Sequence, residues 1–355
     1  MTSRLDAVSA ACPRRLYGHG RPNPGQVLAE LADEAARGGD VDRYGSGGLV
    51  AEVEEEVRAL LGAPAALLLP SGTMAQQIAL RWHADTRGRR TVAMHPTSHP
   101  VVHEEGALAA MHGLTVAAVG DPVSLVTPED LLGVREPAAV LVELPQRETG
   151  GQLMAYDDLA RLAASAHAAG AALHLDGARL WECGPAYGCP LADVVGLADS
   201  TYVSLYKGLG APAGAMLVGS AELVEQARLW RRRHGGTLPW LWPLALGARR
   251  GLREHLPRMG EYVAHAQALA AAIGAVAEVA VPPVTPLFHV LLPGAPEVVE
   301  EALLDVSEAT GVFLGGADPG PRPGVARREI YAGAAALEVA PAEAAGLFAQ
   351  VVARL

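Results

Sequence analysis

Residues 139–178, AVLVELPQRETGGQLMAYDDLARLAASAHAAGAALHLDGA, decide the fold. Two short apolar runs, 139–145 and 172–178, flank the amphipathic stretch 156–170, which ends at a glycine. Short continuous apolar runs predict strands buried on both faces, and a helix between two of them predicts a parallel pair. The alternation recurs from about residue 48 to 220, so we expect an α/β fold whose mostly parallel sheet is flanked by helices. The other predicted strands are 65–70, 91–95, 115–120, 201–207 and 214–219.

The remainder of the chain is patterned differently. A long helical stretch is predicted at about 244–274, and the proline-rich segment 281–296 begins a new unit. The last 75 or so residues have the pattern of a small α+β domain. The expected organisation is therefore an N-terminal arm (1–45), a large α/β domain that binds the cofactor (46–250) and a small C-terminal α+β domain (251–355).

Composition excludes several classes of protein. The 355 residues carry a formal net charge of −11, which disfavours a nucleic-acid surface. No apolar run reaches the roughly 18 residues of a membrane span, and no signal peptide is recognisable. Three cysteines predict neither a disulfide framework nor, without a CxxC pair, a zinc site. We therefore expect a cytoplasmic enzyme without a bound metal, acting on a small molecule.

Lys207 is the single lysine among the 28 basic residues. Arginine replaces lysine easily on a surface, but a guanidinium stays protonated and cannot act as a nucleophile. Lys207 ends a predicted strand and precedes Gly208, where burial lowers the pKa of an amine and makes it competent to form a Schiff base. The alternative is a surface lysine that has remained by chance.

Other polar residues also follow predicted strands, and such strand ends meet at one edge of an α/β sheet. Ser71, Gly72 and Thr73 join a strand to a helix, where free backbone N–H groups favour a phosphate, although a plain helix cap is the alternative. Asp176 ends an apolar run and needs a partner, either a cationic ring nitrogen or Arg179. Together these residues match pyridoxal 5′-phosphate chemistry.

Three histidines, His95, His99 and His103, follow the second predicted strand. Prolines between them break any helical register, so a metal-binding helix face is not expected. The ring of His99 is suited to stack on a planar cofactor or to act as a general base.

These segments resemble the L-threonine aldolase/β-eliminating lyase family of fold-type I pyridoxal-phosphate enzymes, from about Tyr44 to Gly236. The carrying segments are YGSGGLVAEVEEEVRALLGAPAALLLPSGTMAQ (44–76), SHPVVHEEGA (98–107), HLDGARLW (174–181), SLYKGLGAPAG (204–214) and ARLWRRRHGG (227–236). The spacing of HLDGAR and KGLG, with Lys207 31 residues after Asp176, is the most specific feature.

The resemblance implies a role for each matching residue. Lys207 would hold the cofactor as a Schiff base, Asp176 would pair with its pyridine nitrogen, and His99 would stack on its ring. Gly72 and Thr73 would bind the phosphate. The remaining implied contacts are the substrate carboxylate for Arg179, the cofactor for Ser204 (because Tyr206 replaces the usual serine before the lysine) and the substrate for Tyr44. Family members are homodimers or homotetramers with the site at the subunit interface, near Tyr44 and the loop RRRHGG.

The chain departs from the family pattern after the strand at 139–145. Aldolases carry a Glu-Asn-x-His-Asn-like stretch there, and the histidine falls on Gln146, which cannot act as a base. Gln146 and Arg147 are nevertheless expected to contact the substrate. Arg147 would help Arg179 to anchor a carboxylate, or would instead pair with Glu143 or Glu148.

The resulting hypothesis is a lyase that cleaves the Cα–Cβ bond of a β-hydroxy-α-amino acid to give glycine and an aldehyde. The alternatives are another pyridoxal-phosphate reaction (β-elimination, racemisation or transamination) and a catalytically inactive paralogue. A nicotinamide dehydrogenase is disfavoured because PSGTMAQQ (70–77) lacks the glycine fingerprint. The acceptor of the hydroxyl proton stays open among His99, His103, Glu104 and a phosphate-bound water.

Overall fold

The computed structural model describes residues 3–21 and 23–355. The chain forms two compact units, which we describe separately. The larger unit comprises residues 25–149 and 153–257. The smaller unit comprises residues 258–355, residues 150–152 and the described part of residues 1–24.

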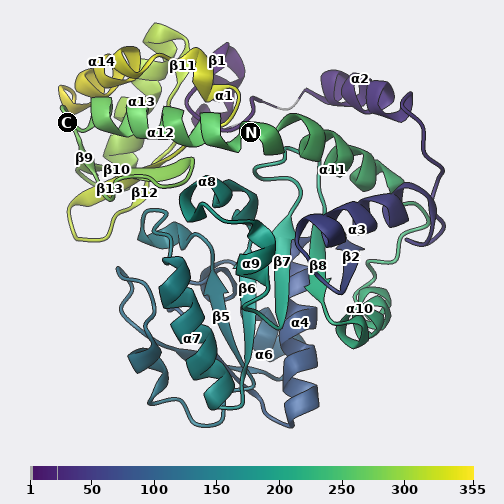
Figure 1. The fold of residues 1–355 in the computed structure, drawn as a ribbon. Coiled ribbons are helices and arrows are strands. Elements are labelled where there is room, and N and C mark those ends of the chain that lie inside the picture. The colour runs from purple at the N-terminus through teal and green to yellow at the C-terminus, as the bar shows by residue number, and fades with distance from the viewer. Residues whose placement is uncertain (1–2, 22) are drawn as a thin grey trace. The chain divides into compact units, whose positions relative to one another are not determined.

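A seven-stranded sheet forms the centre of the larger unit (Figure 1). Its strand order is β2-β8-β7-β6-β5-β3-β4, and only β8 runs antiparallel to its neighbours. The predicted α/β fold with a mostly parallel sheet is thereby confirmed. The strands are β2 (Ala65–Leu69), β3 (Thr91–Met94), β4 (Thr115–Ala118), β5 (Ala139–Glu143), β6 (Ala172–Gly177), β7 (Ser200–Ser204) and β8 (Ala215–Gly219).

Helices cover both faces of this sheet, as right-handed crossovers require. In Figure 1, α7 (Tyr156–Ala168) and α9 (Leu191–Val195) lie in front, with α4 (Gly72–Arg87) and α6 (Ala107–His112) behind. Strands β5, β6 and β7 are buried along their full length, which explains why their sequences are mostly apolar or uncharged, with the two carboxylates at the ends of β5 and β6. The other helices of this unit are α3 (Gly48–Leu60), α5 (His99–Val102), α8 (Gly184–Tyr187), α10 (Ala221–Arg233) and α11 (Trp242–Glu254).

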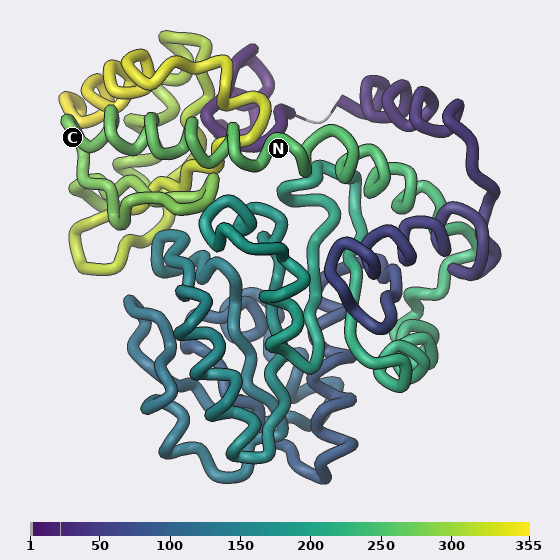
Figure 2. Tube along the Cα trace, in the orientation of Figure 1, coloured from purple at the N-terminus to yellow at the C-terminus, as the bar shows by residue number. Residues whose placement is uncertain are grey.

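The smaller unit is built on an antiparallel sheet with the order β12-β13-β10-β9. Residues near both ends of the chain meet in it, because β1 (Arg14–Arg15) pairs with β11 (Val312–Phe313), as the trace in Figure 2 shows. A core that includes Leu16, Phe288 and Phe348 holds the unit together. Its other elements are α1 (Arg4–Ala11), α12 (Met259–Ile273), α13 (Pro296–Thr310), α14 (Pro341–Val352), β9 (Glu278–Val279), β10 (Leu287–Pro293), β12 (Asp318–Pro319) and β13 (Val325–Tyr331).

The long helical stretch predicted at about 244–274 consists of two helices with a break between them. Helix α11 ends at Glu254, a short 3₁₀ turn spans Leu256–Arg258, and α12 begins at Met259. Pro257 explains the break, because it has no N–H for the helical ladder and disfavours a helical conformation at the residue before it.

Glu34 is a buried acid on α2 (Pro24–Ala35). Its carboxylate lies 2.7 Å from Arg249 Nε and 2.6 Å from Arg253 Nη2, both on α11.

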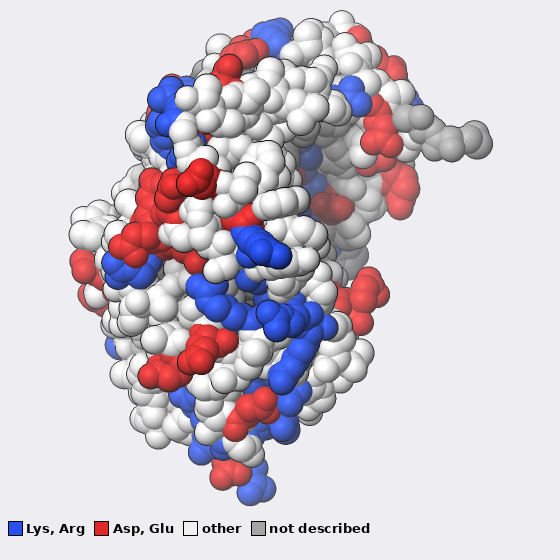
Figure 3. All heavy atoms as spheres, turned by 90° about the vertical axis from the view of Figure 1, so that its right-hand side faces the viewer, with Lys and Arg blue, Asp and Glu red and all other residues white. Residues whose placement is uncertain are grey.

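Figure 3 shows basic side chains gathered on the face of the molecule that turns toward the viewer, with carboxylates beside them. None of the helices in the described part of the chain has the length and apolar character that a bilayer crossing requires.

Candidate functional site

A pocket lies in the larger unit, at the carboxyl ends of the parallel strands. Asp176 comes from the end of β6, Glu143 from the end of β5, and Lys207 from the loop after β7. Parallel strands bring these distant residues to one edge of the sheet. The lining residues are Ser71, Gly72, Thr73, Gln76, Thr97, His99, His103, Glu143, Arg147, Glu148, Asp176, Ala178, Arg179, Tyr202, Tyr206 and Lys207.

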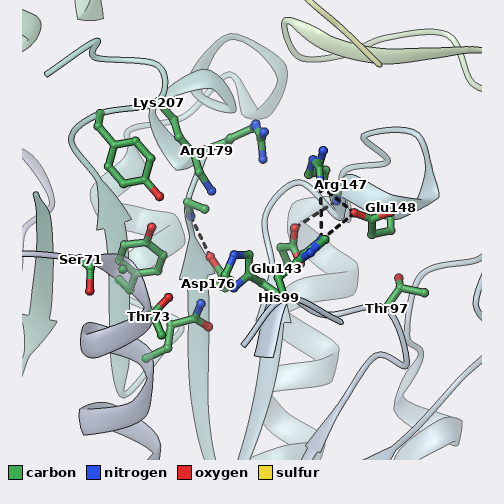
Figure 4. A pocket seen from close by; sticks show the side chains of 16 residues that line it. Ser71, Thr73, Thr97, His99, Glu143, Arg147, Glu148, Asp176, Arg179 and Lys207 are labelled. Carbon is green, nitrogen blue, oxygen red and sulfur yellow. Dashed lines mark hydrogen bonds and ion pairs between the residues drawn. The ribbon is translucent and has the colours of Figure 1, made fainter. Parts of the chain in front are cut away.

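The first turn of α4 forms one side of this pocket (Figure 4). Ser71 caps the helix, because its hydroxyl accepts a hydrogen bond from the backbone N–H of Met74 at 3.3 Å. Gly72 lies against Tyr202, and a Cβ placed on this glycine would be 2.1 Å from the tyrosine Oη. Only glycine therefore fits at the helix start, where the N–H groups and the helix dipole favour an anion.

Asp176 lies at the bottom of the pocket with no exposed surface. Its Oδ1 accepts a hydrogen bond from the backbone N–H of Ala178 at 3.0 Å, whereas Oδ2 has no partner among the described residues. Burial raises the pKa of Asp176, and the nearby Lys207 opposes this shift. A cationic N–H donor would satisfy Oδ2 and return the pKa toward its ordinary value.

Glu143 stands beside Asp176, because the two residues are register partners on β5 and β6. Its Oε1 accepts a hydrogen bond from the backbone N–H of Arg147 at 3.2 Å. Burial, with the charge of Asp176 as a second cause, raises the pKa of Glu143 to about 7. The sequence predicts Glu143 only as a possible ion-pair partner of Arg147, and not as a pocket residue. Its place at the same strand end as Asp176 was the signal that could have identified it.

Lys207 lies in a loop that Ser204 holds in place. The Ser204 hydroxyl accepts hydrogen bonds from the backbone N–H groups of Tyr206 and Lys207, each at 3.3 Å. Burial, followed by the charge of Arg179, lowers the pKa of Lys207 to about 8. About a tenth of this amine is thus unprotonated at pH 7, far more than for an ordinary lysine, and the unprotonated form is the one that attacks an aldehyde.

His99 is held in place by a buried carboxylate. Its Nδ1 lies 3.0 Å from Glu104 Oε1, and the other carboxylate oxygen accepts a hydrogen bond from Gln77 Nε2 at 3.1 Å. His95 has a separate role, since its Nδ1 accepts a hydrogen bond from the backbone N–H of Thr97 at 3.1 Å and its Nε2 bonds to the carbonyl oxygens at 121 and 124. In the described ranges, 3–21 and 23–355, no group of three or more His, Cys, Asp or Glu residues is arranged to hold a metal ion.

Arg147, Glu148 and His103 form a polar cluster on the side of the pocket opposite α4. Figure 4 shows Ser71 and Thr73 on one side, Arg147 and Glu148 on the other, and Asp176 and His99 between them. Glu148 Oε1 lies 2.8 Å from Arg147 Nη1 and 3.2 Å from His103 Nε2. The sequence predicts that Arg147 either anchors a substrate carboxylate or pairs with Glu143 or Glu148. The structure shows the ion pair with Glu148, and the Arg147 side chain also lines the pocket.

The structure places the other predicted site residues as follows. Arg179 is buried and lines the pocket. Ser204 and Gln146 are buried and do not line the pocket; Ser204 accepts hydrogen bonds from the loop of Lys207, and Gln146 Nε2 donates to Thr97 Oγ1 at 3.3 Å. Tyr44 does not line the pocket: its side chain is 52% exposed, and its backbone N–H donates to the carbonyl of Pro239 at 3.0 Å.

Gln76 is a pocket residue that the sequence argument did not single out. It follows the predicted phosphate-binding residues on the first turn of α4 and is buried, with Oε1 lacking a hydrogen-bond partner among the described residues. A polar side chain within one helical turn of the SGT segment was the available signal. A buried amide oxygen without a partner is unfavourable in an empty pocket and favourable in one that holds a hydrogen-bond donor.

Comparison with known proteins assigns the fold and the pocket to a family. A family model described as beta-eliminating lyase matches residues 25–291. The chain belongs to the beta-eliminating lyase family. The matched residues include the whole set that lines the pocket of this lyase.

Several relatives of this beta-eliminating lyase are named as threonine aldolases. Low-specificity L-threonine aldolase 1 of Arabidopsis thaliana is 30% identical over 231 residues, which cover 62% of this chain and 64% of that protein. A solved structure of a putative L-allo-threonine aldolase from Listeria monocytogenes is 36% identical, covers 99% of both chains and has a TM-score of 0.92. A putative aromatic amino acid beta-eliminating lyase/threonine aldolase from Exiguobacterium sp. is 35% identical and covers 99% of this chain and 100% of that one, also with a TM-score of 0.92.

Proposed function

We propose that the protein is a pyridoxal-phosphate-dependent lyase that cleaves the Cα–Cβ bond of a β-hydroxy-α-amino acid to give glycine and an aldehyde. The observation that carries this proposal is the arrangement of Lys207 with Asp176: the only lysine of the chain is half-buried close to a fully buried carboxylate. Membership of the beta-eliminating lyase family and the aldolase names of the relatives support the reaction class.

The residues of the pocket fit pyridoxal phosphate. Asp176 Oδ2 has no hydrogen-bond partner in the described part of the chain and suits a protonated pyridine nitrogen. The α4 start, with Gly72 closely packed and Thr73 in the lining, suits the phosphate. The lowered pKa of Lys207 suits covalent attachment to the cofactor aldehyde.

When bound, pyridoxal phosphate supplies an electron sink for the pair left when the Cα–Cβ bond breaks. Burial alone raises the pKa of Asp176 and disfavours its charged form. A protonated ring nitrogen beside it would restore the charge, and the ionised Asp176 would in turn keep that nitrogen protonated. His99, fixed by Glu104, would cover the ring. Arg179 would bind the substrate carboxylate, and the amine of Lys207 would be placed to move a proton at Cα.

A second reaction on the same cofactor, namely β-elimination, racemisation or transamination, is favoured by one observation. Gln146, which stands where aldolases have a histidine, hydrogen-bonds to Thr97 and Glu143 and does not line the pocket. The group that takes the β-hydroxyl proton in aldolases is then missing from that position. Formation of pyruvate or another keto acid from the same substrates would identify this alternative.

The decisive experiment combines spectroscopy with an aldehyde assay. Purified protein is incubated with pyridoxal phosphate and supplied with threonine, allo-threonine or phenylserine. We expect release of the matching aldehyde, an absorption band that borohydride removes, and a label on Lys207 after reduction. The Lys207→Ala variant should lose the label and at least about 10³-fold in turnover. Labelled protein that releases no aldehyde from any of the three substrates would contradict the aldolase proposal.

We further propose that the protein is a cytoplasmic homodimer or homotetramer with the site near the interface between subunits. Three cysteines without a disulfide support a reducing compartment. Exposed apolar side chains that a second copy could cover support an oligomer, and Tyr44, Leu238 and Trp240 are each more than two-fifths exposed. Sedimentation of the holoenzyme at several concentrations tests the assembly.

A further inference from the structure

We propose that His103, held by Glu148, accepts the β-hydroxyl proton in the lyase reaction. This inference rests on the proposed function and names a residue that the reaction needs. His103 lines the pocket and is 41% exposed, so a bound substrate can reach it. It supplies the base that Gln146 cannot supply, because an amide is not a base and Gln146 does not line the pocket.

The placement of the ligand follows from the rest of the pocket. The phosphate belongs at the start of α4, and the ring nitrogen belongs at Asp176. The polar cluster of Arg147, Glu148 and His103 lies on the opposite side from α4, where neither of these two groups binds (Figure 4). This side is therefore the part of the pocket that remains for the substrate.

Most other lining residues are unsuited to take a hydroxyl proton. Arg147 and Arg179 stay protonated, and burial raises the pKa values of Tyr202 and Tyr206. Asp176 and Glu143 lie together at the strand ends beneath the ring-nitrogen position.

His99 is the competing base. Its Nδ1 is engaged by Glu104, and its charge lies close enough to Asp176 to affect the pKa of that acid. These contacts place His99 at the ring-nitrogen end of the cofactor. The ring centroid of His103 lies 5.2 Å from that of His99, but His103 contacts Glu148 and not Glu104. We therefore assign His99 to the ring and His103 to the hydroxyl.

The hydrogen bonds of His103 define its protonation. Glu148 Oε1 lies 3.2 Å from His103 Nε2, while Arg147 Nη1 lies farther from the same nitrogen at 3.4 Å and closer to the carboxylate at 2.8 Å. A carboxylate only accepts hydrogen bonds, so Nε2 carries the proton and Nδ1 keeps a lone pair. Glu148 also stabilises the imidazolium that forms when Nδ1 takes a second proton.

The step balances without a further reactant. The O–H proton of the substrate moves to His103 Nδ1, and the O–H electron pair forms the C=O bond of the departing aldehyde. The Cα–Cβ bond breaks, and its electron pair stays with the amino-acid fragment. Protonation at Cα then gives glycine, and His103 returns its proton to water.

The test separates the hydroxyl step from cofactor binding. Holoenzyme variants His103→Asn and Glu148→Gln are assayed for aldehyde release from phenylserine and for exchange of the glycine α-proton in D₂O, which involves no hydroxyl. Cofactor affinity is measured by absorbance titration. We expect His103→Asn to lower aldehyde release about 10²-fold, with glycine exchange and cofactor affinity within about twofold of wild type. Glu148→Gln should show the same pattern with a smaller loss.

Two controls complete the design. His167→Asn removes a histidine that lies 2.9 Å from Asp199 outside the pocket, and it should change none of the three measurements. His99→Asn should weaken cofactor binding and lower aldehyde release and exchange together. Unchanged aldehyde release in His103→Asn, or equal losses of release and exchange, would overturn the proposal. Wild-type protein that exchanges glycine protons but releases no aldehyde would contradict the proposed function itself, and is recognised before any variant is made.

Discussion

At the scale of single residues, two buried oxygen atoms in the pocket, Asp176 Oδ2 and Gln76 Oε1, accept no hydrogen bond from the described residues. An unsatisfied buried polar group costs about 1–3 kcal/mol of stability. These two oxygen atoms therefore lower the stability of the empty protein, and a ligand that donates hydrogen bonds to them would restore it. Unpaired polar groups in a binding site thus stabilise the protein with its ligand bound and destabilise the protein without it.

The Gln76→Leu variant should change the stability of the cofactor-free protein and the affinity for the cofactor in opposite directions. We expect the cofactor-free variant to be more stable than wild type by about 1 kcal/mol, because an unpaired amide is replaced by an apolar group. Cofactor affinity should fall about tenfold, because a hydrogen-bonding group is lost. Denaturant unfolding of the cofactor-free protein and absorbance titration measure the two quantities.

The neighbouring Gln77→Leu is the matched control for that experiment. Gln77 is also buried on α4, but its amide donates to Glu104. Its replacement should therefore destabilise the cofactor-free protein. A Gln76→Leu variant that loses stability in the same way would show that the Gln76 amide is already satisfied, against the role proposed for it.

At the scale of secondary-structure elements, the N-terminal end of α4 forms part of the pocket, whereas its C-terminal end only terminates the helix. Ser71 and Gly72 start the helix at the pocket, whereas Gly88 ends it with a φ of 64°, a left-handed conformation that suits glycine. Both glycines are needed, one for space and the other for backbone conformation.

Gly72→Ala should damage the cofactor site specifically. The added methyl group meets the Tyr202 ring and hydroxyl, so that overpacking of about 1–3 kcal/mol displaces the helix start. We expect cofactor affinity to fall at least about tenfold in the absorbance titration. Gly88→Ala should cost about 1–2 kcal/mol of stability in denaturant unfolding and leave affinity unchanged, because its added Cβ meets no atom within 4 Å. Equal affinity losses in both variants would contradict a local effect at the pocket.

Helices α2 and α11 are joined by the buried acid Glu34, which contacts two arginines. Glu34→Gln should lower the free energy of unfolding by about 1–3 kcal/mol, a loss moderated because Arg253 is partly exposed to solvent. Denaturant unfolding measures this change. The exposed pair of Glu261 with Arg258 is the control, and Glu261→Gln should have no measurable effect. Equal stabilities of the two variants would argue against a structural role for Glu34.

At the scale of the whole molecule, the pocket should affect how stability depends on pH. Burial raises the pKa of Glu143 to about 7, so between its ordinary value near 4.5 and 7 the folded state binds more protons than the unfolded state. The contribution of Glu143 to stability therefore falls as the pH rises through this range. Lys207, with its pKa lowered to about 8 from 10.5, acts in the opposite sense, and its contribution rises as the pH rises from 8 to 10.5.

The cofactor-free Glu143→Gln variant tests this pH dependence. The difference in unfolding free energy between the variant and wild type should increase in favour of the variant from about pH 4.5 to 7 and stay constant above that. Urea unfolding at several pH values measures it. A difference that does not change with pH would show that Glu143 titrates at its ordinary pKa in the folded protein.

The sequence alone determined the sheet and the core of the pocket. Apolar runs occur where strands are buried on both faces, and parallel topology brings the strand ends together, so the sequence predicts that Lys207, Asp176, His99 and Gly72 converge. The division into an arm and two domains, with the boundaries given from sequence, stays a prediction, as do the roles of the site residues.

Only the tertiary structure decided which polar side chains face the pocket. Gln146 and Arg147 are adjacent in sequence, yet Arg147 lines the pocket, whereas Gln146 does not line it and hydrogen-bonds to Thr97. The Glu148–His103 and Glu104–His99 contacts likewise depend on how loops fold over the sheet edge. Apolar periodicity records burial against a core and therefore survives in the sequence. The direction of a loop side chain is set by hydrogen bonds to residues elsewhere in the chain, which leave no periodic pattern.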